Sequence, residues 1–94
     1  MVKVSRTISN GKRRNRFSII ADILASAVNG TSKTHLMYKA RLSYAQLKKY
    51  TSKLVKLKLL KITANRRPLI YEATEKGKSF LEIYRELDEL LKPE

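Results

Sequence analysis

The chain lacks most of the residues from which catalytic and metal sites are built. It has 94 residues with no cysteine and one histidine, His35. The absence of cysteine excludes disulfides and thiolate metal sites. Residues 1–71 contain one acid, Asp22, so they offer no carboxylate pair for acid–base catalysis or metal binding. Since no glycine-rich phosphate loop is present either, we expect a protein that is not an enzyme and has no metal, cofactor or small-molecule ligand.

Long hydrophobic runs are also missing. No apolar stretch approaches the ~18–20 residues that cross a bilayer, and the N-terminus has no signal-peptide core. The hydrophobic content of 43% and the charged content of 31% suit one compact domain. We therefore expect a cytoplasmic protein without a membrane partner.

Positive charge is abundant and unevenly distributed. Residues 1–71 hold 17 Lys and Arg against one acid, a net charge of +16. Residues 72–94 hold 4 Lys and Arg against 7 acids, a net charge of −3, and the two parts sum to the total of +13. This distribution predicts that the basic part binds a polyanion and that the C-terminal part has another role.

Residues 32–60 have the pattern of two helices joined by a tight turn. Thr31 or Ser32 is positioned to cap the first helix. Ser43 starts the second with the capping-box pattern S-x-x-Q, and its apolar positions recur at spacings of three and four. Lysines occupy the positions between them. The stretch therefore predicts a helix-turn-helix with a basic second helix at residues 43–57.

The flanking segments complete a winged fold. A helix is expected at residues 17–29, ended by Gly30 and burying one apolar face that includes Phe17. Residues 61–64 and 69–73 alternate like strands around a turn. A last helix is expected from the cap residue Thr74 to about Lys92, with Gly77 allowing close approach to the hairpin. The fold class is α+β and mostly helical, with an N-terminal arm (1–14), a winged helix-turn-helix (15–73) and a C-terminal helix (74–94).

The C-terminal helix has more apolar positions than one buried face requires. Apolar residues recur at spacings of four, three and four, a heptad pattern, and others widen the stripe. We expect a homodimer through paired C-terminal helices; the alternative is a helix that folds back onto its own domain. The expected interface residues are Phe80, Ile83, Tyr84, Leu87, Leu90 and Leu91.

The expected order of elements is helix, helix-turn-helix, hairpin and terminal helix, and five stretches within it are characteristic: KRRNRF (12–17), IADIL (20–24), KTHLMYKA (33–40), LSYAQLKKY (42–50) and YEATEKG (71–77). In these stretches the chain resembles small archaeal winged-helix DNA-binding proteins, the chromatin-protein type that dimerises through its C-terminal helix. Lys58 departs from the pattern, since such families often have glycine there. The resemblance implies a homodimer with one recognition helix and one wing per subunit on duplex DNA.

Duplex DNA is thus the expected partner, in transcription regulation or nucleoid architecture. Residues near the start of the recognition helix are expected at base edges or flanking phosphates, and the other cations at the backbone or, for the hairpin arginines, the minor groove. RNA binding, a protein-interaction adaptor and a merely solvated lysine face remain the alternatives. The candidate DNA-binding residues are Lys12, Arg13, Arg14, Arg16, Lys33, Ser43, Tyr44, Gln46, Lys48, Lys49, Lys53, Arg66 and Arg67.

Overall fold

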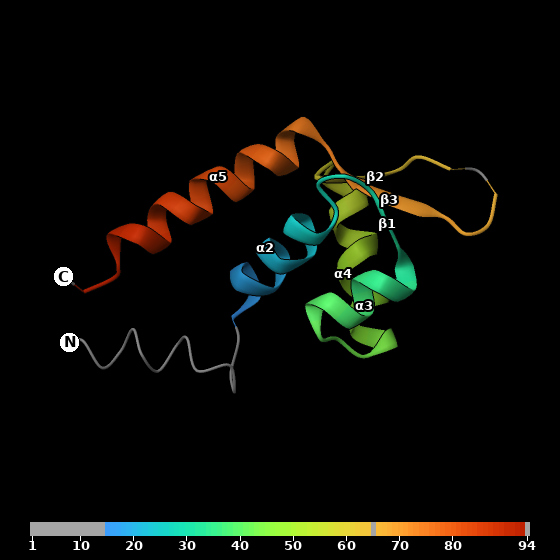
Figure 1. The fold of residues 1–94 in the computed structure, drawn as a ribbon, viewed down its shortest axis with the longest axis horizontal. Coiled ribbons are helices and arrows are strands. Elements are labelled where there is room, and N and C mark those ends of the chain that lie inside the picture. The colour runs from blue at the N-terminus through green and yellow to red at the C-terminus, as the bar shows by residue number, and fades with distance from the viewer. Residues whose placement is uncertain (1–14, 65, 94) are drawn as a thin grey trace.

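The computed structural model describes residues 15–64 and 66–93. Helices α2, α3 and α4 form a helical body, and a three-stranded antiparallel sheet of order β1-β3-β2 lies beside it. Figure 1 shows α5 and the β2–β3 hairpin projecting to opposite sides of this body. The predicted α+β, mostly helical fold is confirmed. The elements are α2 (Arg16–Ser26), β1 (Thr31–Ser32), α3 (Lys33–Ala40), α4 (Tyr44–Lys56), β2 (Leu60–Ile62), β3 (Ile70–Ala73) and α5 (Glu75–Leu90).

Each described helix begins at a side chain that satisfies a free backbone N–H group. The side chains of Asn15, Ser32, Ser43 and Thr74 each accept a hydrogen bond from the N–H three residues later. At Ser43 the capping box is complete, because Gln46 also accepts from the Ser43 N–H. The helix starts predicted at Ser32, Ser43 and Thr74 are therefore confirmed.

Two helix ends turn through left-handed backbone without glycine. Arg41 after α3 has φ 54°, and Lys58 after α4 has φ 65°. Glycine is favoured in this conformation at the end of a helix, and here Lys58 adopts it. The lysine that replaces the family's usual glycine therefore leaves the turn after α4 intact. The predicted end of α2 at residue 29 was wrong: the helix ends at Ser26, and a further turn separates it from Gly30, which has φ 88°.

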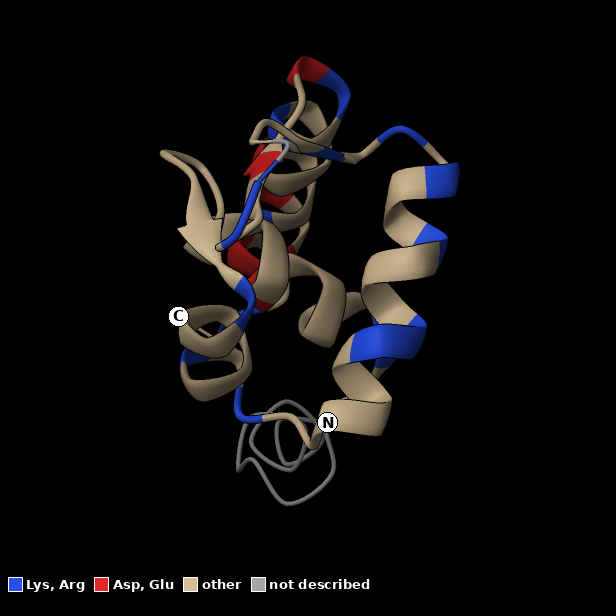
Figure 2. Cartoon of the chain, turned by 90° about the vertical axis from the view of Figure 1, so that its right-hand side faces the viewer, with Lys and Arg blue, Asp and Glu red and all other residues tan. Residues whose placement is uncertain are grey.

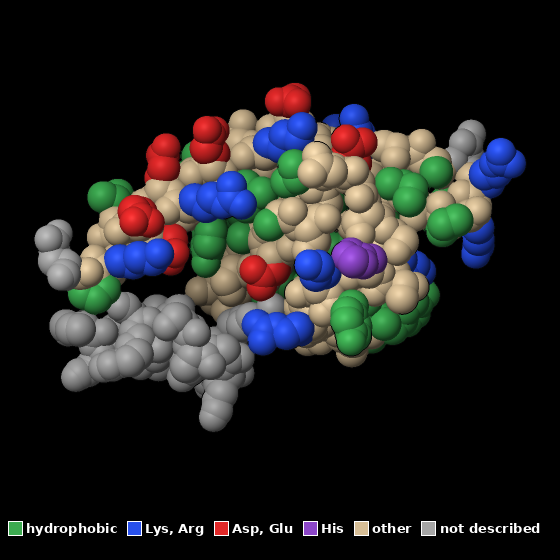
Figure 3. Space-filling model, in the orientation of Figure 1, with side chains coloured by type: hydrophobic (Ala, Val, Ile, Leu, Met, Phe, Trp, Pro, Cys, Tyr) green, Lys and Arg blue, Asp and Glu red, His purple; other side chains and the backbone are tan. Residues whose placement is uncertain are grey.

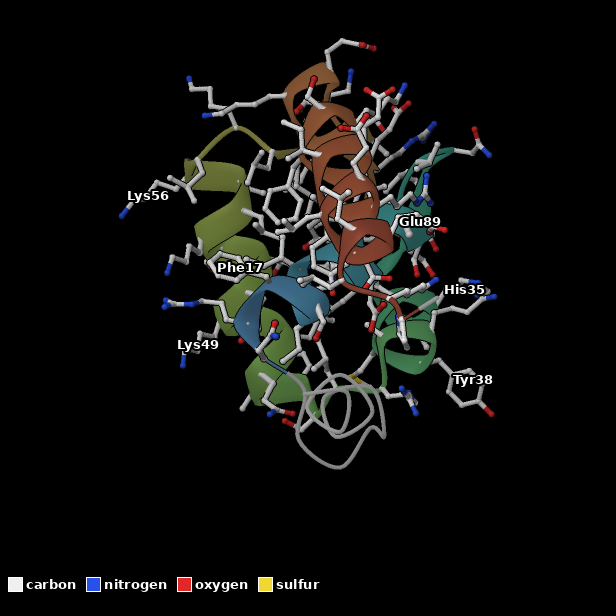
Figure 4. All side chains as sticks on the ribbon, turned by 90° about the vertical axis from the view of Figure 1, so that its left-hand side faces the viewer. Phe17, His35, Tyr38, Lys49, Lys56 and Glu89 are labelled. Atoms are coloured by element: carbon white, nitrogen blue, oxygen red, sulfur yellow. The ribbon has the colours of Figure 1, made fainter. Side chains whose placement is uncertain are left out.

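The core lies where α2, α3, α4 and α5 meet the sheet. Its fully buried large side chains are Ile23, Leu24, Leu36, Leu47, Leu54 and Leu60. Phe17, expected on the buried face of α2, is 56% exposed, so that expectation was wrong. It lies in the first turn of α2, at the surface (Figure 4), and the Arg16 guanidinium sits 5.9 Å from its ring centre. The periodicity of α2 continues to its first turn, but the core does not reach that far.

The hairpin forms where alternation predicted it, with shorter strands than expected. Its ladder continues past β2, because the Thr63 N–H donates to the Ile70 carbonyl at 2.8 Å. The sequence did not reveal β1, in which Thr31 pairs with Tyr71 and Ser32 with Ile70. A strand of two residues is too short to show alternation. Its pairing ties the start of α3 to the hairpin.

The start of α5 is fastened to the end of α4. The Thr74 hydroxyl donates to the Lys58 carbonyl at 2.6 Å, and the Lys76 ammonium donates to the Leu57 carbonyl at 3.0 Å. A methyl group on Gly77 would overlap the carbonyl oxygen of Leu59. The predicted close approach at Gly77 is therefore confirmed, and it fixes the direction in which α5 leaves the body.

Candidate nucleic-acid interface

The outward face of α4 is a row of lysines. At about 100° per residue, Lys49, Lys53 and Lys56 lie opposite the buried stripe of the helix. Figure 2 shows several Lys and Arg positions along α4, and Figure 4 shows Lys49 and Lys56 pointing outward from this helix. None of the three has an ion-pair partner within residues 15–64 and 66–93. Their charge is therefore available to a polyanion.

Lys56 is a surface cation that the list of candidate residues omitted. It is exposed and follows Lys49 by seven residues and Lys53 by three. That helical spacing was visible in the sequence and would have placed it in the set. The lysine row therefore extends over the last two turns of α4, while Lys48 lies on one flank of it.

The first turn of α4 is less free to read bases than the sequence suggested. The Gln46 side-chain oxygen accepts from the Ser43 N–H at 3.1 Å, and the Ser43 hydroxyl accepts from the Gln46 N–H at 3.2 Å. A bidentate contact of Gln46 with adenine needs both its oxygen and its nitrogen, so it would break the capping box. Gln46 precedes Lys53 by seven residues, so it lies on the same outward stripe as the lysines, with its side-chain oxygen already engaged in the cap.

Three candidate residues from different elements line one hollow beside the start of α4. The Lys33 ammonium donates to the Tyr44 hydroxyl at 3.4 Å and lies 4.9 Å from the centre of that ring. Arg67 of the hairpin lines the same open hollow, of about 590 Å³. We call it the wing hollow: Lys33, Tyr44 and Arg67 stand on its rim, and Met37, Pro68 and Leu69 supply apolar walls.

The remaining candidate cations are spread around this surface. Arg66 is exposed in the loop between β2 and β3, and Arg16 is exposed at the start of α2. Lys12, Arg13 and Arg14, together with the arm to which they were assigned, lie outside the described residues. The structure thus brings Lys33, Tyr44 and Arg67 together but does not bring Arg16 into that group.

Helix α5 carries a different surface. Its charged side has both signs, with ion pairs near its two ends: Lys78 with Glu75 at 3.6 Å, and Lys92, just past the helix, with Asp88 at 3.9 Å and Glu89 at 3.7 Å. Figure 3 shows acidic and basic side chains interspersed along this helix. Exposed pairs of this kind contribute little to stability. They leave α5 without the concentrated positive charge of α4.

The expected dimer residues of α5 divide into two groups. Phe80 and Tyr84 stack on each other with ring centres 6.3 Å apart and pack against the core. Burial raises the pKa of the Tyr84 phenol, and the carboxylates of Asp88 and Asp22 raise it further, so the phenol stays neutral at physiological pH. The second group is 52–80% exposed and faces solvent: Ile83, Leu87, Leu90 and Leu91.

Other kinds of site find no support in the described part of the chain. It contains no group of three or more side chains able to hold a metal ion. None of its helices has the length and apolar character of a membrane span.

Comparison with known proteins agrees with this architecture. No curated protein matches the chain in sequence. Sso10a-2, a DNA-binding protein from Sulfolobus solfataricus, is 28% identical and superposes with a TM-score of 0.68, over 86% of this chain and 100% of that one. The adhesin competence repressor AdcR from Streptococcus pyogenes is 26% identical, with a TM-score of 0.63 over 96% of this chain and 69% of that one.

BpsR from Bordetella bronchiseptica shows the same fold at 18% identity and a TM-score of 0.68, over 95% of this chain and 64% of that one. The match to Sso10a-2 confirms the resemblance to small archaeal winged-helix DNA-binding proteins. The sequence model of the winged helix-turn-helix family matches residues 13–92. The chain therefore belongs to the winged helix-turn-helix family.

Proposed function

We propose that the chain binds duplex DNA, with α4 in the major groove and the β2–β3 hairpin against the neighbouring backbone. The observation that carries this proposal is the outward row of Lys49, Lys53 and Lys56, unpaired within the described ranges. A major groove of B-DNA is wide enough for one helix. Lysines along such a helix neutralise phosphates on the groove walls. The similarity to Sso10a-2, a DNA-binding protein, supports the same proposal.

The binding is driven mainly by backbone contacts. Lysine is the main residue type on the outward face of α4, and the side-chain oxygen of Gln46 is held in the capping box. Contacts to phosphate position a protein without reading sequence. We therefore favour an architectural, nucleoid-associated role in the cytoplasm over recognition of a single operator. The arm at residues 1–14, with Lys12, Arg13 and Arg14, would add further backbone contacts.

We also propose that two copies pair through α5, which makes residues 74–94 a dimerisation helix and residues 15–73 the DNA-binding unit. Ile83, Leu87 and Leu90 follow Lys76 by seven, eleven and fourteen residues, so they lie on one stripe with it. Since Lys76 bonds to the end of α4, this stripe faces the α4 side of the molecule. Figure 1 shows that α5 extends beyond the body, and a second α5 would cover the apolar stripe there.

The test is binding to a DNA duplex of random sequence and to double-stranded RNA of equal length, by fluorescence anisotropy over a range of salt. We expect tighter binding to DNA, because the deep, narrow major groove of RNA does not admit a helix. With about six to ten phosphates neutralised, the log–log slope should be near −0.9 per phosphate. Tighter binding to RNA, or no affinity for either at physiological salt, would contradict the proposal.

A further inference from the structure

We infer that the wing hollow is a seat for one backbone phosphate of the DNA, held jointly by Lys33 of α3 and Arg67 of the hairpin. This inference rests on the proposed function and names one contact within it. The two residues are 34 positions apart in the chain, by their numbers, and line the same hollow. No acidic side chain lines it among the described residues. A phosphodiester is the ligand whose charge complements two cations of this kind.

The Lys33 side chain is held in place before any ligand arrives. Its ammonium contacts both the face and the hydroxyl of Tyr44, at 4.9 Å from the ring centre and 3.4 Å from the oxygen. A cation over an aromatic ring is attracted by the ring's negative face. This contact keeps the ammonium beside the first residue of α4, at the end of the helix that enters the groove. Ordering a lysine beforehand removes part of the entropy that binding would otherwise lose.

The walls of the hollow are apolar and firmly supported. Met37 and Leu69 are partly buried and pack against the core, while Pro68 follows Arg67 directly. An apolar wall beside two cations matches a backbone unit in which a deoxyribose adjoins its phosphate. The pairing of β1 with β3 connects the start of α3 to the hairpin, so Lys33 directly follows one of two paired strands and Arg67 lies in the loop that leads into the other. A shared phosphate would therefore fix the hairpin relative to α4 on the duplex.

Salt dependence distinguishes one shared phosphate from two separate ones, because it counts phosphates neutralised and not cations present. We would measure binding of the full chain to a random DNA duplex for Lys33→Ala, Arg67→Ala and the double variant. If the phosphate is shared, each single variant keeps one cation on it. Each single variant should then keep the slope of log affinity against log salt concentration and should weaken binding about two- to fivefold. The double variant should lose about 0.9 in slope and bind more weakly than the product of the single effects predicts.

Arg66→Ala is the matched control, since Arg66 neighbours Arg67 but does not line the hollow. Combined with Lys33→Ala it should give additive losses. A slope that falls by about 0.9 in each single variant and by twice that in the double would indicate two phosphates and overturn the shared seat. An unchanged double variant would also overturn it. Failure of the unmodified chain to bind DNA would instead contradict the proposed function.

A free anion is the other source of the same chemistry. Inorganic phosphate, added at constant ionic strength, should leave DNA binding of the unmodified chain and of the double variant unchanged relative to chloride. If phosphate weakened binding only in the unmodified chain, the hollow would be a site for a small anion, and the assignment to the DNA backbone would be wrong. Thermal unfolding of every variant checks the fold, and because Arg67 is exposed and Lys33 only partly buried, we expect little change.

Discussion

Helices α4 and α5 start alike and differ in what they present to solvent. Each begins at a hydroxyl side chain that accepts from the N–H three residues on, and each buries one stripe against the same core. The outward side of α4 carries lysines without ion-pair partners in the described ranges, whereas α5 carries charges of both signs, some of them in ion pairs, and leaves an apolar stripe exposed. The comparison teaches that the buried faces specify the fold, while the two outer faces differ in the way that the two proposed partners, DNA and a second copy, would require.

The largest effect is expected from reversing charge on α4. Lys49→Glu combined with Lys53→Glu should weaken binding to a random duplex by about 100-fold or more, since each lost phosphate contact is worth roughly tenfold at moderate salt. Both side chains are exposed, so stability should be kept. The matched control is Arg85→Glu with Lys92→Glu on α5, which should change affinity by less than about threefold. Equal losses in the two double variants would mean that net charge matters and the face does not.

The junction of the two helices is tested by stability. Gly77→Ala should lower the free energy of unfolding by about 2–3 kcal/mol, because the added methyl overlaps the Leu59 carbonyl, which is backbone and cannot rotate away. Ser79→Ala, an exposed position of the same helix, should stay within about 0.5 kcal/mol of the unmodified chain. Urea unfolding measures both. An unchanged midpoint for Gly77→Ala would show that α5 does not sit against the end of α4.

The apolar stripe of α5 is tested by association. Leu87→Glu should convert a dimer to a monomer in sedimentation experiments, because it buries a charge in the proposed interface. DNA affinity should fall about tenfold as the contacts of the second subunit are lost. Glu86→Gln, a neighbouring position on the charged side of the helix, should remain dimeric. A monomeric unmodified chain at micromolar concentration would refute the pairing.

The smallest effect concerns the turn that leaves α4. Lys58→Gly should stabilise the chain by about 1 kcal/mol, since glycine adopts φ 65° without the penalty that a side chain carries. The same substitution two residues earlier, Lys56→Gly, should destabilise it by about 0.5–1 kcal/mol, because that residue is helical. Changes of opposite sign in the thermal unfolding temperature of the two variants would confirm the left-handed turn, and changes of the same sign would contradict it.

Features set by neighbouring residues were the ones that the sequence could predict. The caps at Ser32, Ser43 and Thr74, the buried stripe of α4 and the hairpin follow from residue type and spacing over a few positions. The close approach at Gly77 was also predicted. The order of the elements then sufficed to indicate the winged fold.

Features set by distant residues were not predictable. The strand β1 exists because β3 pairs with it, and Phe17 is exposed because the core ends before the first turn of α2. The candidate site shows the same division. Lysine spacing indicated the outer face of α4, but the meeting of Lys33 with Arg67 depends on how the sheet brings α3 to the hairpin. No pattern among neighbouring residues in the sequence predicts that approach.

One measurement tests the central claim most directly: the salt dependence of binding to a random duplex and to the DNA upstream of the chain's own gene. If α4 acts mainly as a row of phosphate contacts, the two duplexes should give the same slope and affinities within about threefold at every salt concentration. A preference of about tenfold or more for the upstream duplex that persists at high salt would contradict the account. It would show that base contacts, and not the lysine row, decide where the protein binds.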